Sequence, residues 1–281
     1  SFKEITQIIH PNAGSIESTI ASQFYQSPSD ELFLVGITGT NGKTTTAFLI
    51  KHLLDHMGEA NCGLIGTIEY IIGKYRYQAV RTTPDVSSNH KMLREMVLQG
   101  CNSAVMEVTS HALDQNRVEH IHFDVAIFTN LTVDHLDYHR DMENYCAAKS
   151  KLFSSLDRKI KKKTHHYHPV AVINKDSTWH QRIIEKCSSS IITYGIESEA
   201  DLKASEIAFS SCGTSLNLSY KGTSIPFAWP IIGRFNVYNL LAAVAVGLVR
   251  GLSLEAVAKI MKTASPAPGR LEFVPNPRSE E

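Results

Sequence analysis

A glycine-rich segment between an apolar run and a helical pattern constrains the fold more than any other part of the chain. Residues 32–35 are Leu-Phe-Leu-Val, and residues 36–46 read Gly-Ile-Thr-Gly-Thr-Asn-Gly-Lys-Thr-Thr-Thr. A strand that passes through a glycine turn into a helix is a unit of parallel α/β folds. Backbone N–H groups in such a turn bind phosphate oxygens, so the segment predicts a phosphate-binding loop.

Each residue type in this loop has an expected role. Gly39 and Gly42 let the backbone approach phosphate, the ammonium of Lys43 reaches the terminal phosphates, and the Thr44 hydroxyl serves Mg²⁺. The strict G-x-x-x-x-G-K-[ST] pattern is not met, because Ile37 stands where the first glycine belongs. The prediction therefore depends on the strand and the helix around the loop, and a plain glycine-rich turn is the alternative.

Short apolar runs alternate with amphipathic stretches from residue 32 onward. This alternation predicts an α/β fold with a mostly parallel sheet and helices on both faces. Residues 202–228, in which apolar and polar side chains roughly alternate, are expected to add antiparallel strands at one edge. Strands are expected near 32–37, 62–72, 103–108, 123–129, 169–173 and 190–194, and helices near 43–57, 86–99, 141–155, 176–186, 236–250 and 253–263.

The composition excludes several classes of protein. Lys plus Arg and Asp plus Glu each number 28, so no net basic field favours nucleic acid or an anionic membrane. Five separated cysteines without a C-x-x-C pair fit a reducing cytoplasm rather than a disulfide framework or a zinc site. The longest uncharged helical run, 235–249, is too short to span a membrane. The basic run 158–163 and the histidines after it are expected to form a loop that faces water, with a binding patch or a metal-binding tract as the alternative.

The chain is expected to contain one complete domain. Residues 32–264 would form this nucleotide-binding domain. Residues 1–30 show no convincing unit, so we interpret residues 1–31 as a remnant of a preceding domain or a linker. The Pro/Gly-rich stretch that begins at residue 265 is typical of a linker, and we assign residues 265–281 to a connection with a further domain.

Polar residues follow two further apolar runs, at the edge of a parallel sheet where ligands bind. Glu107 ends the run 104–106 and could hold Mg²⁺, with a carboxylate that faces solvent as the alternative. His135 lies in the polar stretch 129–139 after the next run. A lone histidine is more often a cap or a surface group than a ligand, so the residues alone leave its role open.

Two other positions are also ambiguous from the residues alone. Thr82 and Thr83 precede an expected helix, where their hydroxyls either belong to a capping segment or meet an anionic ligand. Lys149 lies on the expected helix 141–155, and nothing in the local pattern distinguishes it from a solvated lysine.

Taken together, seven motifs in one order resemble the central ATPase domain of the Mur ligase family, in its MurE branch. The resemblance covers about residues 20–275. The motifs are Thr-Gly-Thr-Asn-Gly-Lys-Thr (38–44), Thr-Thr-Pro-Asp (82–85), Met-Glu-Val-Thr-Ser-His-Ala-Leu (106–113), Phe-Thr-Asn-Leu (128–131), Asp-His-Leu-Asp-Tyr-His (134–139), Ala-Ala-Lys (147–149) and Gly-Arg-Phe-Asn-Val-Tyr-Asn (233–239).

The resemblance implies an ATP-dependent amide ligase of peptidoglycan precursor synthesis. Such an enzyme phosphorylates the carboxylate of UDP-MurNAc-L-Ala-D-Glu, and the amine of a diamino acid, meso-diaminopimelate or L-lysine, then attacks the acyl phosphate. The family has three domains, and this chain would supply the central one. We therefore expect a monomeric protein of the bacterial cytoplasm that binds nucleotide but turns over poorly as a fragment.

The resemblance also implies roles residue by residue. Lys43, Glu107, His135 and Lys149 would be catalytic. Lys43 and Thr44 would bind the β/γ-phosphates and one Mg²⁺, and Glu107, His135 and Lys149 would gather around a second Mg²⁺. In the family the lysine that matches Lys149 is carbamylated by CO₂, which turns a cationic amine into an anionic oxygen ligand. ATP would be bound by Gly39, Thr40, Asn41, Gly42, Lys43, Thr44, Thr45, Asn236, Asn239 and Arg270, and the muramoyl dipeptide by Thr82, Thr83, Thr109, Gln115 and Arg117.

Two alternatives stay open at this stage. A folylpolyglutamate or cyanophycin synthetase shares the superfamily, and a P-loop switch shares the loop but needs no converging ligase residues. The chain departs from the family at Thr109, where Ser is common. Asn276-Pro277-Arg278 lacks the preceding Asp of the family's acceptor-specificity motif, so we do not assign it that role.

Overall fold

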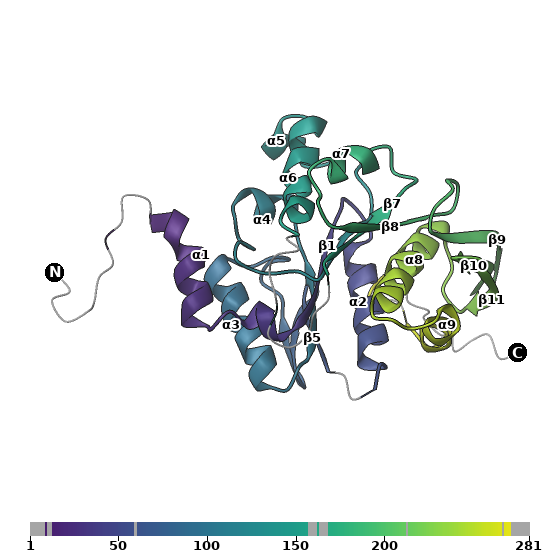
Figure 1. Cartoon of the computed structure of the whole chain (residues 1–281), viewed down its shortest axis with the longest axis horizontal. Helices are drawn as coiled ribbons and strands as arrows, with labels where there is room; N and C mark the ends of the chain where they lie inside the picture. The colour runs from purple at the N-terminus through teal and green to yellow at the C-terminus, as the bar shows by residue number, and fades with distance from the viewer. Residues whose placement is uncertain are drawn as a thin grey trace, which may run out of the picture.

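The computed structural model describes residues 9, 13–58, 61–156, 162, 168–211, 213–265 and 267–270. In this part of the chain eleven strands form one sheet, in the order β11-β10-β9-β8-β7-β6-β1-β5-β2-β3-β4 (Figure 1). The strands are β1 (Phe33–Thr38), β2 (Cys62–Ile65), β3 (Glu69–Ile72), β4 (Tyr75–Gln78), β5 (Ser103–Glu107), β6 (Val125–Phe128), β7 (Val170–Asn174), β8 (Ser190–Gly195), β9 (Leu202–Ser210), β10 (Gly213–Tyr220) and β11 (Thr223–Trp229).

The helices cover both faces of this sheet. Figure 1 shows α3 and α2 on opposite sides of β1 and β5, which confirms the predicted layered α/β fold. A short 3₁₀ helix, Pro28–Glu31, precedes β1. The α-helices are α1 (Ala13–Phe24), α2 (Lys43–Asp55), α3 (Val86–Leu98), α4 (Ser110–Asp114), α5 (Leu136–His139), α6 (Met142–Ser154), α7 (His180–Ile184), α8 (Arg234–Val249) and α9 (Leu254–Met261).

The centre of the sheet is parallel and fully buried. Val35 of β1 pairs with Val105 of β5 on one side and with Val125 of β6 on the other. Every residue of β1 is buried, which explains its continuous apolar sequence. Parallel pairing continues from β6 through β7 and β8 to β9. These strands therefore end at one common edge.

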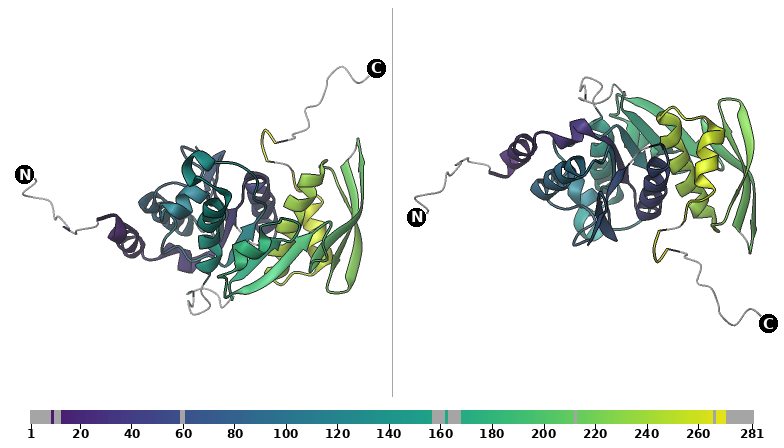
Figure 2. Two further views of the ribbon diagram at one scale, coloured as in Figure 1. Left: turned by 90° about the horizontal axis from the view of Figure 1, so that it is seen from above. Right: turned by 90° about the horizontal axis from the view of Figure 1, so that it is seen from below.

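Antiparallel strands occur at both ends of the sheet rather than at one. The predicted meander forms β9 to β11, which lie beside α8 and α9 and far from α1 in both views of Figure 2. The single strand predicted over residues 62–72 is wrong. The chain turns between β2 and β3, and β3 pairs antiparallel with β2 and with β4.

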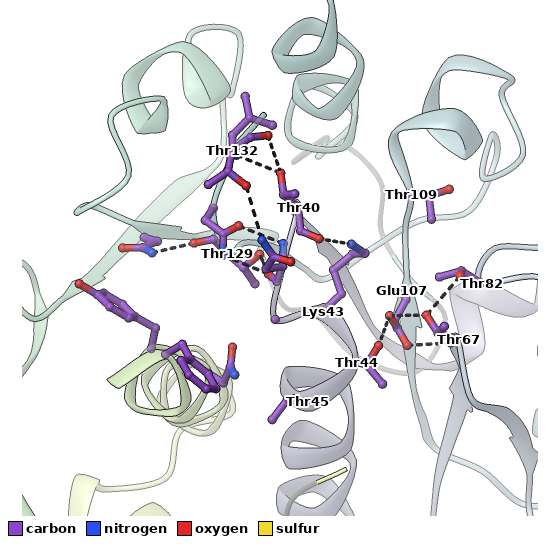
Figure 3. A pocket seen from close by; sticks show the side chains of 18 of the residues that line it. Thr40, Lys43, Thr44, Thr45, Thr67, Thr82, Glu107, Thr109, Thr129 and Thr132 are labelled. Atoms are coloured by element: carbon purple, nitrogen blue, oxygen red, sulfur yellow. Dashed lines mark hydrogen bonds between the residues drawn. The ribbon is translucent and has the colours of Figure 1, made fainter. Parts of the chain in front are cut away.

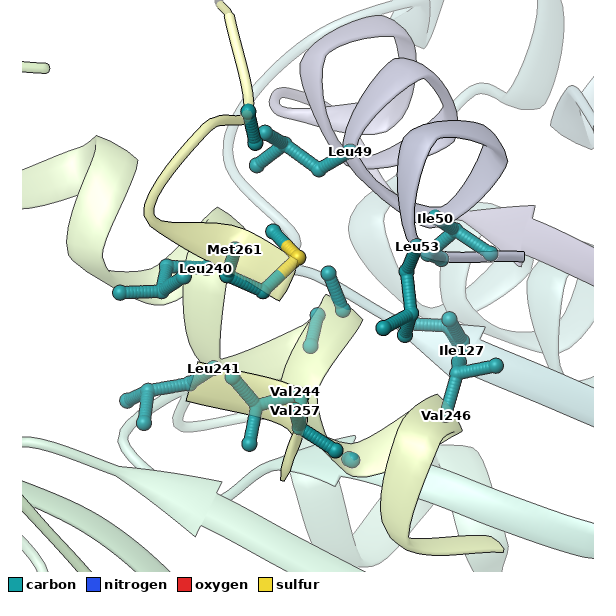
Figure 4. Close-up of a cluster of buried hydrophobic side chains, with 14 of the residues drawn as sticks. Leu49, Ile50, Leu53, Ile127, Leu240, Leu241, Val244, Val246, Val257 and Met261 are labelled. Carbon is teal, nitrogen blue, oxygen red and sulfur yellow. The ribbon is translucent and has the colours of Figure 1, made fainter. Parts of the chain in front are cut away.

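Two apolar cores lie on the two faces of the sheet. One core packs α2, α8 and α9 against the sheet, with Leu53, Leu240 and Met261 among its buried side chains (Figure 4). Helix α8 is apolar around most of its circumference because both the sheet and its neighbouring helices cover it. The other core lies under α3 and α6 and includes Leu93 and Phe153.

Several sequence expectations need correction. No element was predicted before residue 32, but the structure has α1 and the 3₁₀ helix there. Helix α7 is shorter than the predicted 176–186, and α4 and α5 were not predicted. Most of the basic run 158–163 and residues 271–281, which include the Asn-Pro-Arg triplet, lie outside the described residues.

One lysine of that basic run does not face water. Lys162 is buried, and its ammonium donates hydrogen bonds to the Asp124 carboxylate and, at 3.0 Å, to the Leu32 carbonyl. This pair lies at the start of β6, away from the carboxyl ends of the strands. No helix in the described part of the chain has the length and hydropathy that a membrane crossing requires.

Candidate functional site

A cleft of about 1310 Å³ opens beyond the carboxyl ends of the central strands, as predicted for a parallel sheet. Of the predicted site residues, all but Gly39, Gln115 and Lys149 line it. The lining consists of residues 40–45, 81–83, 129–132 and 176–178 together with Thr67, Glu107, Thr109, His111, Arg117, His135, Asn174, Phe235, Asn236, Tyr238, Asn239, Gly269 and Arg270.

The glycine loop between β1 and α2 forms the floor of the cleft. Gly39 has a φ of +149°, and a Cβ there would lie 1.9 Å from Thr129 Oγ1, so no other residue fits without a shift. Asn130 holds the loop, because its carbonyl and side-chain oxygens accept from the N–H groups of Thr40 and Asn41 at 2.9 and 3.0 Å. Helix α2 begins at Lys43 with no side-chain cap, which leaves its positive end available to an anion.

The Lys43 side chain folds back over this loop. Its ammonium donates to the Gly39 carbonyl oxygen at 2.9 Å and to the Thr40 carbonyl oxygen at 2.8 Å, and Figure 3 shows the bond to Thr40. Burial lowers the pKa of Lys43, although the charges of Glu107 and Asp134 act in the opposite direction. A terminal phosphate in the loop would offer this amine better acceptors than two neutral carbonyls.

Glu107 is a buried carboxylate at the end of β5, adjacent to the loop. It accepts hydrogen bonds from the Thr44 hydroxyl at 2.8 Å and from the Thr67 N–H and hydroxyl at 2.8 and 3.0 Å (Figure 3). A hydroxyl and a carboxylate in contact are oxygen donors of the kind that Mg²⁺ binds, with water and phosphate completing its shell. The Thr44–Glu107 pair could therefore hold one magnesium ion between them, whereas the family resemblance assigns the two residues to different ions.

Among the hydrogen bonds of the described residues, none joins the other two predicted metal ligands to that pair. His135 has a positive φ of 52° and a half-exposed side chain, and its ring is 5.1 Å from that of His111. Lys149 on α6 is almost fully buried behind the loop, which is the opposite of a solvated lysine. Within the described ranges, no three His, Cys, Asp or Glu side chains form a cluster that could hold a metal by themselves.

The predicted donor-substrate residues gather on the β5 side of the cleft. The Thr83 hydroxyl donates to the Glu107 carbonyl at 2.8 Å and accepts from the Thr109 N–H at 3.1 Å. Arg117 donates from one terminal nitrogen to the Thr83 carbonyl at 3.1 Å. The Thr82 hydroxyl forms a hydrogen bond with the Thr67 hydroxyl, and Thr67 donates to the Glu107 carboxylate. The threonine hydroxyls of this wall therefore extend to Glu107.

Gln115 lies behind Arg117 rather than in the cleft wall. Its side-chain oxygen accepts from Nε and from the other terminal nitrogen of Arg117, at 3.0 and 2.5 Å. Because the amide is neutral, it orients the guanidinium without cancelling its charge. The structure thus connects Gln115 to the predicted anion clamp through Arg117.

The asparagine pair on α8 borders the loop at the other end of the cleft. The Asn239 side-chain oxygen accepts from the Thr46 hydroxyl at 3.2 Å, and its amide donates to the Asn236 side-chain oxygen at 3.2 Å. A Cβ at Gly42 would lie 2.5 Å from that Asn239 oxygen. Both asparagines are therefore tied to the loop region, and Arg270 adds a further cationic side chain to the lining.

Sequence reasoning missed Asp176, which organises this same end. Its carboxylate accepts from the N–H groups of Ile196 and Ser198, both at 2.7 Å, and from the Tyr238 hydroxyl at 2.8 Å. Burial opposes ionisation, but these hydrogen bonds outweigh it and lower the pKa of Asp176. Its place just after the apolar run 170–173 was the signal that could have revealed it.

Comparison with known proteins agrees with this geometry. The Mur ligase middle domain matches residues 37–247. The UDP-N-acetylmuramoyl-L-alanyl-D-glutamate–2,6-diaminopimelate ligase of Bacillus cereus is 42% identical over 257 residues, which are 92% of this chain and 52% of that protein. The ligase of the same name from Geobacter sulfurreducens is 42% identical over 261 residues, which are 93% of this chain and 50% of that protein.

A solved structure of a ligase of that name superposes with a TM-score of 0.81 at 28% identity and covers 98% of this chain and 55% of its own. The chain spans about half the length of the curated relatives it matches. The sequence motifs, the cleft at the strand ends and the domain match agree, and the chain belongs to the Mur ligase family.

Proposed function

We propose that this chain binds ATP and activates the terminal carboxylate of UDP-MurNAc-L-Ala-D-Glu, as the middle domain of a longer amide ligase. One observation carries the proposal: a single cleft contains a phosphate loop with Lys43, the buried Glu107 carboxylate and the Arg117 guanidinium. A nucleotide and an anionic second substrate would thus meet in one cavity. Its base-side wall would include Asn236, Asn239 and Arg270.

The side chains divide the chemistry between them. The loop N–H groups and Lys43 would bind the β- and γ-phosphates, with Lys43 leaving the Gly39 and Thr40 carbonyls to do so. Mg²⁺, held by Thr44 and Glu107, would offset negative charge on the phosphates. Arg117, with Thr82, Thr83 and Thr109 beside it, would hold the donor carboxylate toward the γ-phosphate, since a forked guanidinium suits an anion.

We also propose that Lys149 is carbamylated and that its carbamate, with His135, contributes to a second metal position. Burial and, after it, the charge of Lys43 lower the pKa of Lys149 well below its ordinary value. A neutral amine is the form that reacts with CO₂, so this environment supports the modification. His135 lines the cleft on the side of the loop where α6 lies.

The acceptor would be a diamino acid, meso-diaminopimelate or L-lysine. The names of the two relatives favour 2,6-diaminopimelate. The acceptor would bind in the part of those longer proteins that this chain does not match. We further propose a monomer in the bacterial cytoplasm.

Nucleotide turnover in the full-length protein tests the function. UDP-MurNAc-L-Ala-D-Glu should stimulate phosphate release, whereas folate or an Asp/Arg polymer should not. Stimulation by folate or by the polymer instead would favour another branch of the superfamily. Arg117→Lys should weaken the response to the muramoyl dipeptide, because an ammonium lacks the paired donors of the guanidinium.

Bicarbonate distinguishes a ligase from a nucleotide-dependent switch. Removal of CO₂ should slow hydrolysis, and short carboxylates should restore part of the activity of Lys149→Ala. A switch would show neither response. For the 281-residue chain alone we expect nucleotide binding with little tripeptide formation. Efficient tripeptide synthesis by this chain would contradict the proposal that the acceptor binds outside it.

A further inference from the structure

We propose that Tyr145 is a positioning residue, which holds the Lys149 amine against the phosphate loop and ties the same loop to the segment after β6. Tyr145 lies on α6 one helical turn before Lys149, an i, i+4 spacing that brings two side chains together. It is 1% exposed and lies among the largest fully buried side chains. The proposal rests on the proposed function only in taking the loop to bind ATP, and it concerns the unmodified Lys149 amine, the form with which CO₂ would react.

The ring of Tyr145 makes the first contact. The Lys149 ammonium nitrogen lies over this ring at 4.5 Å from its centroid, and the same nitrogen donates to the Gly39 carbonyl at 2.9 Å. An N–H group over an aromatic face is attracted to it, strongly when the amine is charged and more weakly when it is neutral. The ring and the carbonyl together fix where this long, otherwise mobile side chain ends.

The hydroxyl of Tyr145 makes the second contact. It lies 3.3 Å from the Thr40 hydroxyl, which in turn accepts from the Thr132 N–H at 3.0 Å. Thr40 belongs to the phosphate loop, and Thr132 belongs to the segment that follows β6 and leads to His135. One buried phenol therefore connects α6 with both edges of the predicted phosphate site.

A third interaction holds the ring itself. His139 stacks on Tyr145 with ring centroids 5.0 Å apart and an interplanar angle of 27°, and its Nε2 pairs with the Ser110 hydroxyl at 2.9 Å. Packing on several sides leaves the ring little freedom, so it can serve as a fixed support. The two functions of Tyr145, ring and hydroxyl, should be separable by substitution.

Lysine modification measures the contribution of the ring. Both proteins are kept in CO₂-free buffer so that Lys149 carries no carbamate. In Tyr145→Met, which keeps an apolar side chain but removes the aromatic face, formaldehyde with cyanoborohydride should methylate Lys149 about tenfold faster than in the wild type. Lys162 is an internal control, because it is also buried but its partner Asp124 is unrelated to Tyr145. Its modification rate, measured by mass spectrometry of peptides, should stay unchanged.

Nucleotide binding measures the contribution of the hydroxyl. Tyr145→Phe should leave Lys149 modification at the wild-type rate and raise the dissociation constant for ATP about fivefold, as expected for loss of one neutral hydrogen bond. Tyr77→Phe on the outer strand β4 is the matched control, since Tyr77 is half-exposed and outside the cleft. It should bind ATP like the wild type.

Several outcomes would overturn the inference. Equal acceleration at Lys149 and Lys162 in Tyr145→Met would reduce Tyr145 to general support of the fold, and acceleration at neither lysine would remove its role. If Tyr145→Met does not fold, Tyr145→Phe decides, and unchanged ATP affinity refutes the link through Thr40. A wild-type chain that binds no ATP would contradict the proposed function instead. The ratio of the methylation rates of Lys149 and Lys162 would still test the role of the ring.

Discussion

Lys43 and Lys149 donate to the same acceptor, the carbonyl oxygen of Gly39, each at 2.9 Å. The two amines come from different helices, α2 and α6, and meet at the glycine loop. Two buried ammonium groups at one neutral oxygen repel each other. This repulsion favours the loss of a proton from one of the two lysines. Lys149, which is the more strongly shifted of the two, is the amine that this arrangement favours in its neutral form.

The first prediction concerns the stability of Lys149→Met. The pKa of Lys149 is lower in the folded protein than in the unfolded chain. Between these two pKa values the unfolded chain binds more protons than the folded protein, so the free energy of unfolding of the wild type rises with pH. The variant lacks this term, so its stability relative to wild type should be greatest near neutral pH and should decline toward pH 10. In Lys149→Met the Gly39 carbonyl still accepts a hydrogen bond from Lys43, so the substitution leaves this buried oxygen with a donor.

Urea unfolding of both proteins between pH 7 and 10 in CO₂-free buffer gives this comparison. Lys162→Met is the contrasting variant, because it removes the ammonium that pairs with the buried Asp124 carboxylate. It should be less stable than the wild type at neutral pH. A Lys149→Met advantage that grows with pH would contradict the pKa direction on which the prediction depends.

The second prediction concerns the crowding at Gly39. Gly39→Ala should unfold more easily than the wild type and lose nucleotide binding, because the new Cβ would lie 1.9 Å from Thr129 Oγ1 and 3.0 Å from the Asn130 carbonyl. Gly251→Ala is the control, since its φ is also positive, +85°, but no atom lies within 4 Å of the new Cβ. It should cost only the backbone strain, about 1–3 kcal/mol. Equal losses in both variants would mean that crowding contributes nothing.

The third prediction separates the two ends of the cleft. Asp176→Asn should raise the dissociation constant for ATP about tenfold, because an amide replaces a charged acceptor of several hydrogen bonds. Isothermal titration calorimetry should show little change in tripolyphosphate binding, since the Asp176 carboxylate accepts its hydrogen bonds from residues 196–198 and Tyr238 and not from the glycine loop. Equal weakening of both ligands would show that Asp176 supports the whole cleft.

The fourth prediction concerns the buried carboxylate at the end of β5. Glu107→Gln should weaken Mg²⁺-dependent ATP binding by more than tenfold but leave metal-free binding nearly unchanged. Its new amide group would face the donors of Thr44 and Thr67, so a stability loss of about 1–3 kcal/mol should accompany it. The comparison of titrations with Mg²⁺ and with a chelator decides, and an equal effect under both conditions would argue against a metal role.

The short-range features of this chain were predictable from its sequence. The strand, the glycine loop and the start of α2 at Lys43 lie within a few residues of one another, and their positions were correct. The family resemblance, carried by local motifs, is confirmed by the domain match. The assigned roles of the cleft residues remain predictions.

Features that depend on distant contacts were not predictable. The break between β2 and β3 follows from Glu107, because its carboxylate oxygen approaches within 2.5 Å of where a Cβ on Gly66 would lie and accepts from the Thr67 N–H. Within residues 62–72, Gly66 is a local signal of a close backbone contact, but it does not identify Glu107 as the residue that approaches. The burial of Lys149 likewise depends on Gly39, which is far away in the sequence.

The interior place of β1 has a consequence for how this protein is made. Its neighbours β5 and β6 follow it in the chain by many residues, and Asn130, which clasps the loop, comes after both. A ribosome therefore releases the glycine turn long before the segments that shape it. The nascent polypeptide should acquire affinity for nucleotide only once β6 and the turn beyond it have emerged.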